Sequence, residues 1–178
     1  MNHAQVIDAA LGANASATGS KPKQGKYVPV GTGPAYWGPG DEITFLITGE
    51  ETDGAVFMAE ASVPPGGGPP PHIHHREDES FYVREGTLAI LAGDRTVTAT
   101  PGDFVHIPRG TVHCFKNIGN GHAKMLVTFT PAGMEKFFEE AFYPAGDRSV
   151  GPPLLTEELL GRFLAAATKG GVEFLPPQ

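Results

Sequence analysis

The chain has 178 residues, which is long enough for one domain with a substantial hydrophobic core. Hydrophobic residues make up 40% and charged residues 19%, a balance typical of globular proteins, and no apolar run is long enough to cross a membrane. The net charge is −7, so the sequence offers no basic surface of the kind that nucleic acids require. Cys114 is the only cysteine, which excludes a disulfide within the chain and fits a reducing compartment.

Residues 1–26 are small, polar and irregular, and we interpret them as a loose N-terminal arm. The Ala-rich stretch 4–17 has a faint likeness to a signal peptide, but it lacks a basic start and contains interrupting polar residues. We therefore expect a cytoplasmic protein. The rest of the chain divides by its patterns into a β-domain over residues 27–132 and a C-terminal helical extension over residues 133–178.

Short strands dominate the predicted β-domain. β-branched and aromatic residues recur in brief runs that end at turn-forming residues, and glycine (24) and proline (17) are abundant. The runs cover residues 43–48, 55–63, 80–84, 87–91, 96–98, 104–107, 113–116 and 124–130. Pairs such as Gly93-Asp94 and Asn120-Gly121 tolerate positive φ and predict tight turns between the strands. Many short strands separated by turns are typical of a closed β-sandwich or barrel.

Two helices are predicted after Gly133, where apolar residues begin to recur every three to four positions. The first covers residues 134–142. The second covers residues 157–169, with Thr156 as its N-cap and Gly170-Gly171 at its end. We interpret their wide apolar faces as packing against the outside of the barrel or against a second subunit, and the alternative is that they form a lid over a binding site.

Four potential metal ligands occur in two segments of fixed spacing. The segments read Gly66-x5-His72-x-His74-x4-Glu79-x6-Gly86 and Gly102-x5-Pro108-x-Gly110-x2-His113-x3-Asn117. Three imidazoles and one carboxylate form a mixed nitrogen and oxygen donor set that suits a divalent transition metal. On a six-coordinate ion these ligands would leave positions open for a substrate or dioxygen. We predict that His72, His74, Glu79 and His113 bind one such ion.

A proline-rich stretch over residues 64–71 leads into the first two of these ligands. Its prolines donate no backbone hydrogen bond, so we expect a sheet ladder to restart only at His72. Residues two apart in a strand face the same way, so His72 and His74 point together, while His75 points away and is not expected to be a ligand. The stiff approach would help to orient the two histidines; the alternative is a solvated loop with no further role.

The same alternation predicts the remaining pocket residues. Phe81 shares a strand face with Glu79, and Phe115 shares one with His113, so both phenylalanines should line the cavity around the ligands. His106 lies just before the turn of the second segment, and we treat it as a further pocket candidate.

The two segments resemble both signature motifs of the cupin superfamily, and the run from His72 to Tyr82 is similar to small bacterial cupins grouped with quercetin dioxygenases. The resemblance covers roughly residues 40–130. It implies a mainly β fold, a double-stranded β-helix or jelly-roll barrel with the C-terminal helices packed outside. It also implies that the three histidines and the glutamate hold Fe, Ni, Mn, Co, Cu or Zn, and that Glu79 serves as both ligand and catalytic base.

Three functions with a small-molecule ligand remain open. The first is a metal-dependent dioxygenase acting on an aromatic or enolisable compound, which the Phe-rich inner strand faces favour. The second is a cupin isomerase or decarboxylase, which would need further acid and base groups in the pocket. The third is a binding protein without catalytic activity that holds a structural metal, because fold alone does not determine function.

Apolar residues outside the two motifs predict a homodimer. Tyr36 and Trp37 lie in a Pro- and Gly-rich stretch before the first strand, where they pack either on the barrel or on a second subunit. Phe137, Phe138 and Phe142 share one face of the first predicted helix. We expect a symmetric dimer to bury some of these side chains.

Overall fold

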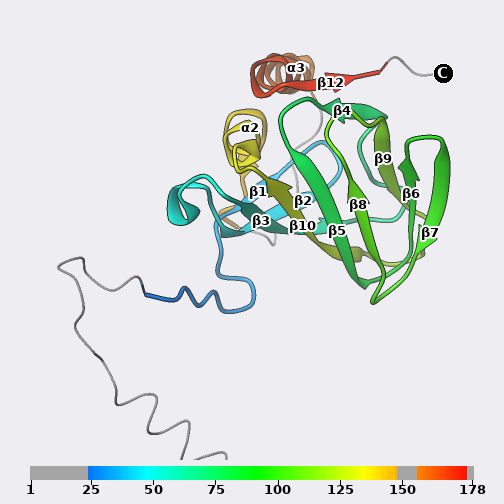
Figure 1. Ribbon diagram of the computed structural model, residues 1–178, viewed down its shortest axis with the longest axis horizontal. Helices are drawn as coiled ribbons and strands as arrows, with labels where there is room; N and C mark the ends of the chain where they lie inside the picture. Colours follow the sequence, from blue (N-terminus) through cyan, green and yellow to red (C-terminus); the bar gives the residue numbers. More distant parts are fainter. Residues whose placement is uncertain (1–23, 148–155, 176–178) are drawn as a thin grey trace, which may run out of the picture.

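Two antiparallel β-sheets face each other in the computed structural model, which describes residues 24–147 and 156–175 (Figure 1). The larger sheet contains, in spatial order, β11 (Tyr143–Pro144), β1 (Ala35–Trp37), β2 (Glu42–Ile47), β3 (Phe57–Val63), β10 (Ala123–Thr130), β5 (Asp78–Glu85) and β8 (Phe104–Ile107). The smaller sheet contains β12 (Val172–Phe174), β4 (His72–His74), β9 (His113–Asn117), β6 (Leu88–Ala92) and β7 (Arg95–Ala99). This architecture confirms the predicted jelly-roll fold. Its strands form two separate sheets instead of one continuous barrel.

The hydrophobic core lies between the two sheets. In β3 and β10 every second side chain is buried, so one face of each strand points inward. Phe57, Phe81 and Ile90 on the inner faces are fully buried. Burying a side chain of this size stabilises the fold by about 1.5–3 kcal/mol. The alternation seen in the sequence therefore identifies the side chains that fill the interior.

The predicted strands are all present, but the structure adds short ones that the sequence did not reveal. β1, β11 and β12 contain only two or three residues each, too few to show a hydrophobic period. β11 pairs with β1, and β12 pairs with β4, so the region after residue 133 contributes a strand to each sheet. Residues 1–23, which make up most of the expected N-terminal arm, lie outside the described residues.

Both predicted helices are confirmed, as α2 (Met134–Ala141) and α3 (Glu157–Gly170); a short 3-10 helix, η1 (Glu50–Thr52), joins β2 to β3. The Thr156 hydroxyl accepts a hydrogen bond from the Leu159 N–H at 3.1 Å, as expected of an N-cap. Gly171 ends α3 with a φ of 80°, a conformation that glycine adopts without strain. Neither helix, among the residues that the structure describes, has the length and apolar character needed to cross a bilayer.

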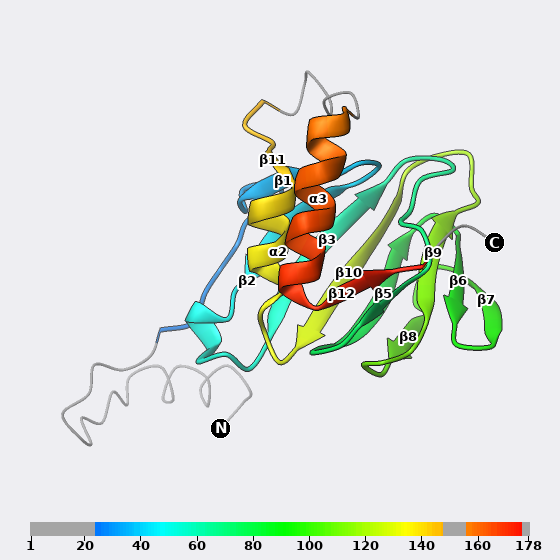
Figure 2. The ribbon, with the colours of Figure 1, turned by 90° about the horizontal axis from the view of Figure 1, so that it is seen from above.

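The helices lie outside both sheets and side by side (Figures 1 and 2). Phe138 of α2 packs against three phenylalanines on the inner face of the larger sheet, with ring centroids 5.9–6.3 Å apart: Phe45, Phe57 and Phe129. The apolar faces of the helices therefore point into the space between the sheets. The helices thus pack outside the two sheets, as predicted, and their apolar faces close one side of the interior.

Polar contacts hold the two helices in this position. Arg162 of α3 donates hydrogen bonds to the carbonyl oxygens of Ala141 and Phe142 at 3.2 and 2.9 Å, and it lies over the Tyr143 ring at 4.2 Å. A cation at these carbonyls also compensates the partial negative charge at the end of α2. α3 is thus fixed to the end of α2 by a charged group and not by apolar packing alone.

The apolar residues that suggested a dimer already pack against other residues of the same chain. Trp37 is 8% exposed, and its Nε1 donates to Glu42 at 3.0 Å. The Tyr36 ring packs against Phe45 with centroids 4.8 Å apart, and the aromatic face of α2 is buried against the core. The dimer therefore remains a prediction, without its original support.

Replacing Phe138 with alanine should destabilise the protein by about 3–5 kcal/mol, because the substitution leaves a cavity where α2 meets the inner face of the larger sheet. Phe104 provides a matched control. It lies in β8 with 65% of its surface exposed, so Phe104→Ala should change stability by less than about 0.5 kcal/mol. Urea unfolding of the two variants measures both values. Equal losses would show that α2 does not depend on this contact.

Candidate metal centre

The four predicted ligands converge in the space between the two sheets. His72 and His74 come from β4 and His113 from β9, and His72 and His113 are direct partners in the ladder of the smaller sheet. Glu79 comes from β5 in the opposite sheet. One ligand atom from each residue lies within 4.8 Å of the others, and all four side chains are buried. The site thus joins the two sheets.

Backbone carbonyl groups orient two of the imidazole rings. The Nδ1–H of His72 donates to the Pro70 carbonyl oxygen at 2.9 Å, and the Nδ1–H of His113 donates to the Thr111 carbonyl oxygen at 2.9 Å. Hydrogen bonds of this kind fix the ring tautomer and direct the other nitrogen, Nε2, toward a metal. Pro70 belongs to the proline-rich stretch, so this segment does help to orient a ligand and is not simply a solvated loop.

Glu79 lies among the imidazoles and accepts from them. Its Oε2 is 2.7 Å from Nε2 of His113 and 3.4 Å from Nε2 of His74. Burial opposes ionisation of this carboxyl, but the hydrogen bonds from His113 and His74, and their charges, outweigh burial and lower its pKa. The Glu79 side chain is therefore a carboxylate, which is the form that binds a metal ion.

The histidines differ in their charge state. Burial lowers the pKa of His72 to about 3, with a further contribution from the nearby His113, so His72 is neutral at physiological pH. Burial also opposes protonation of His113, but the hydrogen bond to Glu79 and its charge raise the pKa of His113. A ligating nitrogen carries no proton, so a bound cation would take the place of the proton between His113 and Glu79.

The residues present fit a divalent transition metal ion. The donor set combines imidazole nitrogens with one carboxylate and contains no thiolate, which suits several first-row metals. Nε2 atoms of His74 and His113 and an oxygen of Glu79 already approach one another without an ion.

His75 and His106 lie outside the cluster. His75 is exposed and pairs with Glu173 at 2.8 Å, as the strand alternation predicted. His106 is also exposed, on the outer face of β8, where its Nδ1 lies 2.9 Å from the Ser80 hydroxyl. The prediction that His106 lines the pocket is therefore wrong. It lies one residue before the buried Ile107, so the alternation of β8 turns it outward.

Phe81 and Phe115 are both buried beside the cluster, but only Phe115 lines the cavity. Phe81 meets Phe115 edge to face, with centroids 5.7 Å apart, and supports it from behind. Strand alternation predicted the inward direction of both rings correctly. It could not show that one ring would lie behind the other, because that depends on how the two sheets pack.

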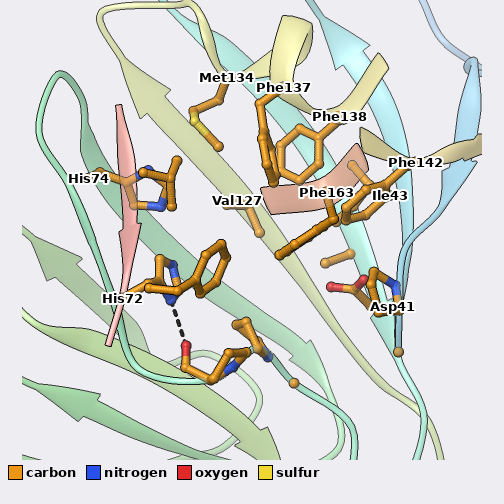
Figure 3. Close-up of a pocket in the computed structure, with 18 of the residues that line it drawn as sticks. Asp41, Ile43, His72, His74, Val127, Met134, Phe137, Phe138, Phe142 and Phe163 are labelled. Atoms are coloured by element: carbon orange, nitrogen blue, oxygen red, sulfur yellow. Dashed lines mark hydrogen bonds between the residues drawn. The ribbon is translucent and has the colours of Figure 1, made fainter. Parts of the chain in front are cut away.

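A cavity of about 320 Å³ extends from the ligands to the helices. Its walls come from both sheets, from the proline-rich stretch and from α2 and α3, as Figure 3 shows. Apart from the ligands, most lining side chains are aliphatic or aromatic, including Val127, Met134 and Phe163. A volume of this size is in the range of sites for small organic ligands. α2 and α3 therefore cover one side of this cavity as well as packing outside the sheets.

Asp41 is a titratable cavity residue that the sequence did not predict. It lies directly before β2, and in Figure 3 its carboxyl points into the cavity from the side opposite His72 and His74. Burial raises the pKa of Asp41 from 3.8 to about 7. An aspartate after Pro39-Gly40 is typical of a turn, so no local signal marked it.

Glu77 is a second buried carboxyl, in the polar segment between β4 and β5. Its side chain is 4% exposed, and burial raises its pKa although the charge of His74 acts in the opposite direction. Within the described residues, Glu77 Oε2 and His74 Nδ1 are the buried side-chain atoms that lack a hydrogen-bond partner. Glu77 is thus a buried carboxyl close to a ligand and not part of the surface.

Substitution of any ligand should abolish tight metal binding. Loss of a hydrogen-bond partner of a ligand costs ~10–100-fold in affinity, so His72→Ala or His113→Ala should cost more than about 100-fold. His75→Ala and His106→Ala are matched controls, because both side chains are exposed and outside the cluster. Elemental analysis and competition with a chelator measure the effect. Equal metal loss from His75→Ala would contradict the assignment.

Asp41→Asn should stabilise the protein in a pH-dependent way. Because the folded-state pKa is raised to about 7, the native state binds a proton more tightly than the unfolded chain, and native stability falls as pH rises from 3.8 to about 7. Asp41→Asn has no carboxyl to titrate at this position, so its stability does not fall in this way. Urea unfolding of metal-free protein should show equal stabilities near pH 3, a growing advantage for the variant up to pH 7, and a constant difference above it. A difference that does not vary with pH would contradict the burial of this carboxyl.

Comparison with known proteins agrees with this geometry. Residues 59–129, which contain all four ligands, match the family model described as "Cupin domain". Over 100 residues the chain is 29% identical to quercetin 2,3-dioxygenase of Bacillus subtilis (strain 168), covering 56% of this chain and 29% of that protein. Over 94 residues it is 32% identical to polyketide synthase CurC of Streptomyces cyaneus, covering 52% of this chain and 60% of that protein. The chain thus spans less than two thirds of either relative.

The fold is also similar to solved structures. A predicted oxalate decarboxylase from Thermotoga maritima aligns with a TM-score of 0.52 at 22% identity, covering 56% of this chain and 92% of that chain. A RmlC-like cupin from Shewanella frigidimarina NCIMB 400 aligns with a TM-score of 0.52 at 19% identity, covering 64% of this chain and 98% of that chain. These structures show a similar fold alone, and the matched family model, together with the two sheets, assigns residues 59–129 to the cupin superfamily.

Proposed function

We propose that this protein is a metal-dependent dioxygenase that acts on an aromatic or enolisable small molecule. The observation that carries the proposal is the position of the ligand cluster at the wall of a largely apolar cavity of about 320 Å³. A cluster that served only to stabilise the fold would not need a cavity beside it, since structural metal sites are closed.

The cavity lining favours an apolar substrate. Among the described residues, the titratable side chains that line it are the ligands His72, His74 and Glu79 and, on the other side, Asp41. A small polar dicarboxylate or a sugar would leave most of its oxygen atoms facing phenylalanine and valine, which costs free energy because buried polar groups need hydrogen-bond partners. An aromatic or enolic molecule matches the walls and needs few polar contacts.

The names of the relatives point in the same direction. One is a quercetin dioxygenase and another is assigned to polyketide synthesis. The similarity covers less than two thirds of each relative, so it supports a class of substrate and not a particular compound. The oxidative reaction of the first relative is compatible with the donor set found here.

We assign the roles of the residues as follows. A divalent transition metal held by His72, His74, Glu79 and His113 would supply Lewis acidity and a place where substrate and dioxygen meet. Glu79 accepts the proton that the substrate hydroxyl or enol loses, because its carboxylate is the base on this side of the cavity.

The apolar walls restrict where this chemistry can occur. Phe115 and Phe129 line the cavity beside the ligands and keep the site poor in water. The Phe129 ring also packs edge-on against His74, with centroids 5.6 Å apart, so the same side chain shields a ligand and holds its orientation. Exclusion of water strengthens the electrostatic effect of the ligands on a bound anion.

Oxygen consumption tests the proposal. The protein, loaded in turn with Fe, Mn, Co, Ni, Cu and Zn, is incubated with flavonols, phenols and β-diketones in an oxygen-electrode cell. We expect uptake of one dioxygen per product formed, and incorporation of labelled oxygen into the product by mass spectrometry. Glu79→Gln should lower turnover by about 10²–10⁴-fold in the fraction of variant that retains metal.

Phe104→Ala is the control for unrelated changes, because its side chain lies on the outer surface and should leave turnover unchanged. Conversion of a substrate without oxygen uptake would instead favour a cupin isomerase or decarboxylase. Binding without any conversion would favour a protein that holds small molecules beside a structural metal.

A further inference from the structure

We infer that Asp41 is a specificity residue, which binds a hydroxyl group at the end of the substrate remote from the metal centre. The inference rests on the proposed function in one respect: the other end of the substrate is taken to bind through an oxygen at the ligand cluster. It narrows the substrate to an elongated, mostly apolar molecule with oxygen functions at both ends.

The position of Asp41 carries this inference. Its carboxyl faces the cavity across from His72 and His74, and Ile43, Phe142 and other apolar residues surround it (Figure 3). No hydrogen-bond donor or cation within residues 24–147 and 156–175 pairs with this carboxyl. It does not cap its own turn either: the turn is closed by the Gly38 N–H, which donates to the Asp41 backbone carbonyl at 2.9 Å.

Asp41 is half-buried, and a gap at Gly38 makes room for its carboxyl at the cavity wall. A Cβ on Gly38 would overlap the ring of Phe142 and would lie 2.6 Å from Oδ1 of Asp41, so the missing side chain leaves room for both groups. The apolar surroundings oppose ionisation of this carboxyl, so burial raises its pKa as described above. Unpaired polar groups of this kind are typical of binding sites, where a ligand supplies the partner.

A hydroxyl is the partner that fits best. A hydroxyl donates to a carboxylate and accepts from a protonated carboxyl, so it pairs with either form of a group that titrates near neutrality. An ammonium group pairs only with the ionised form, and its transfer into apolar walls costs more free energy than transfer of a hydroxyl. The same walls provide no second carboxylate, among the described residues on that side, to share a full positive charge.

Two flavonols that differ by one atom test the inference. The first has an unsubstituted phenyl ring, and the second has one hydroxyl at the para position of that ring; both chelate through the same hydroxy-ketone. Their dissociation constants are measured by fluorescence or calorimetry on zinc-loaded protein under nitrogen, because zinc has no redox chemistry and turnover is then absent. The native protein should bind the para-hydroxy compound about tenfold more tightly, the gain typical of a hydrogen bond to a charged group.

In Asp41→Ala this preference should disappear, while affinity for the unsubstituted flavonol changes less than about twofold. Asp41→Asn keeps the size of the side chain and should lose part of the preference, so it serves if the alanine variant does not fold. Asp94→Asn, at an exposed turn, controls for loss of one negative charge and should keep the full preference.

Equal binding of the two flavonols by the native protein, a preference that persists in Asp41→Ala, or no binding of either compound would overturn the inference. The result is independent of oxygen chemistry. A preference that depends on Asp41, together with an absence of oxygen uptake by protein loaded with redox-active metals, would therefore leave the inference standing and reject only the dioxygenase proposal.

Discussion

The convergence of three imidazoles on one buried carboxylate is the constraint on which the rest of the structure depends. Glu79 would be costly to bury as a free anion, and its pairing with His113 at 2.7 Å compensates that cost when no ion is bound. Because the histidines belong to one sheet and the glutamate to the other, this pairing also links the two sheets across the core. The chemistry of the site and the stability of the jelly roll are therefore not separable.

The C-terminal region completes the site. β12 pairs with β4, so the strand that carries two of the ligands is held between neighbours on both sides. An aromatic series continues from there to the helices: the His72 ring packs against Phe174, Phe174 against Phe163, and Phe163 against Phe137, with centroids 5.0–5.4 Å apart. A change in the position of α3 would thus shift the rings that pack against His72. The helices therefore support a ligand as well as covering the cavity.

Much of this could be predicted from local pattern. Alternation in β4, β5 and β9 was sufficient to predict that the ligands point inward and His75 outward, because side chains two apart in a strand share a face. Features that depend on packing could not be predicted in this way. The sequence does not show that the helices face inward, that Glu77 is buried, or that Asp41 meets the cavity, because each requires the relative placement of segments far apart in the chain.

The central claim, that these four side chains bind one ion at the wall of the cavity, is tested most directly by anomalous X-ray diffraction from crystals of the metal-loaded protein. We predict a single strong anomalous peak, ~2.0–2.2 Å from Nε2 of each of the three histidines and from an oxygen of Glu79. A peak elsewhere, for example beside His75 or His106, or no peak in crystals grown with each of the candidate metals, would contradict it.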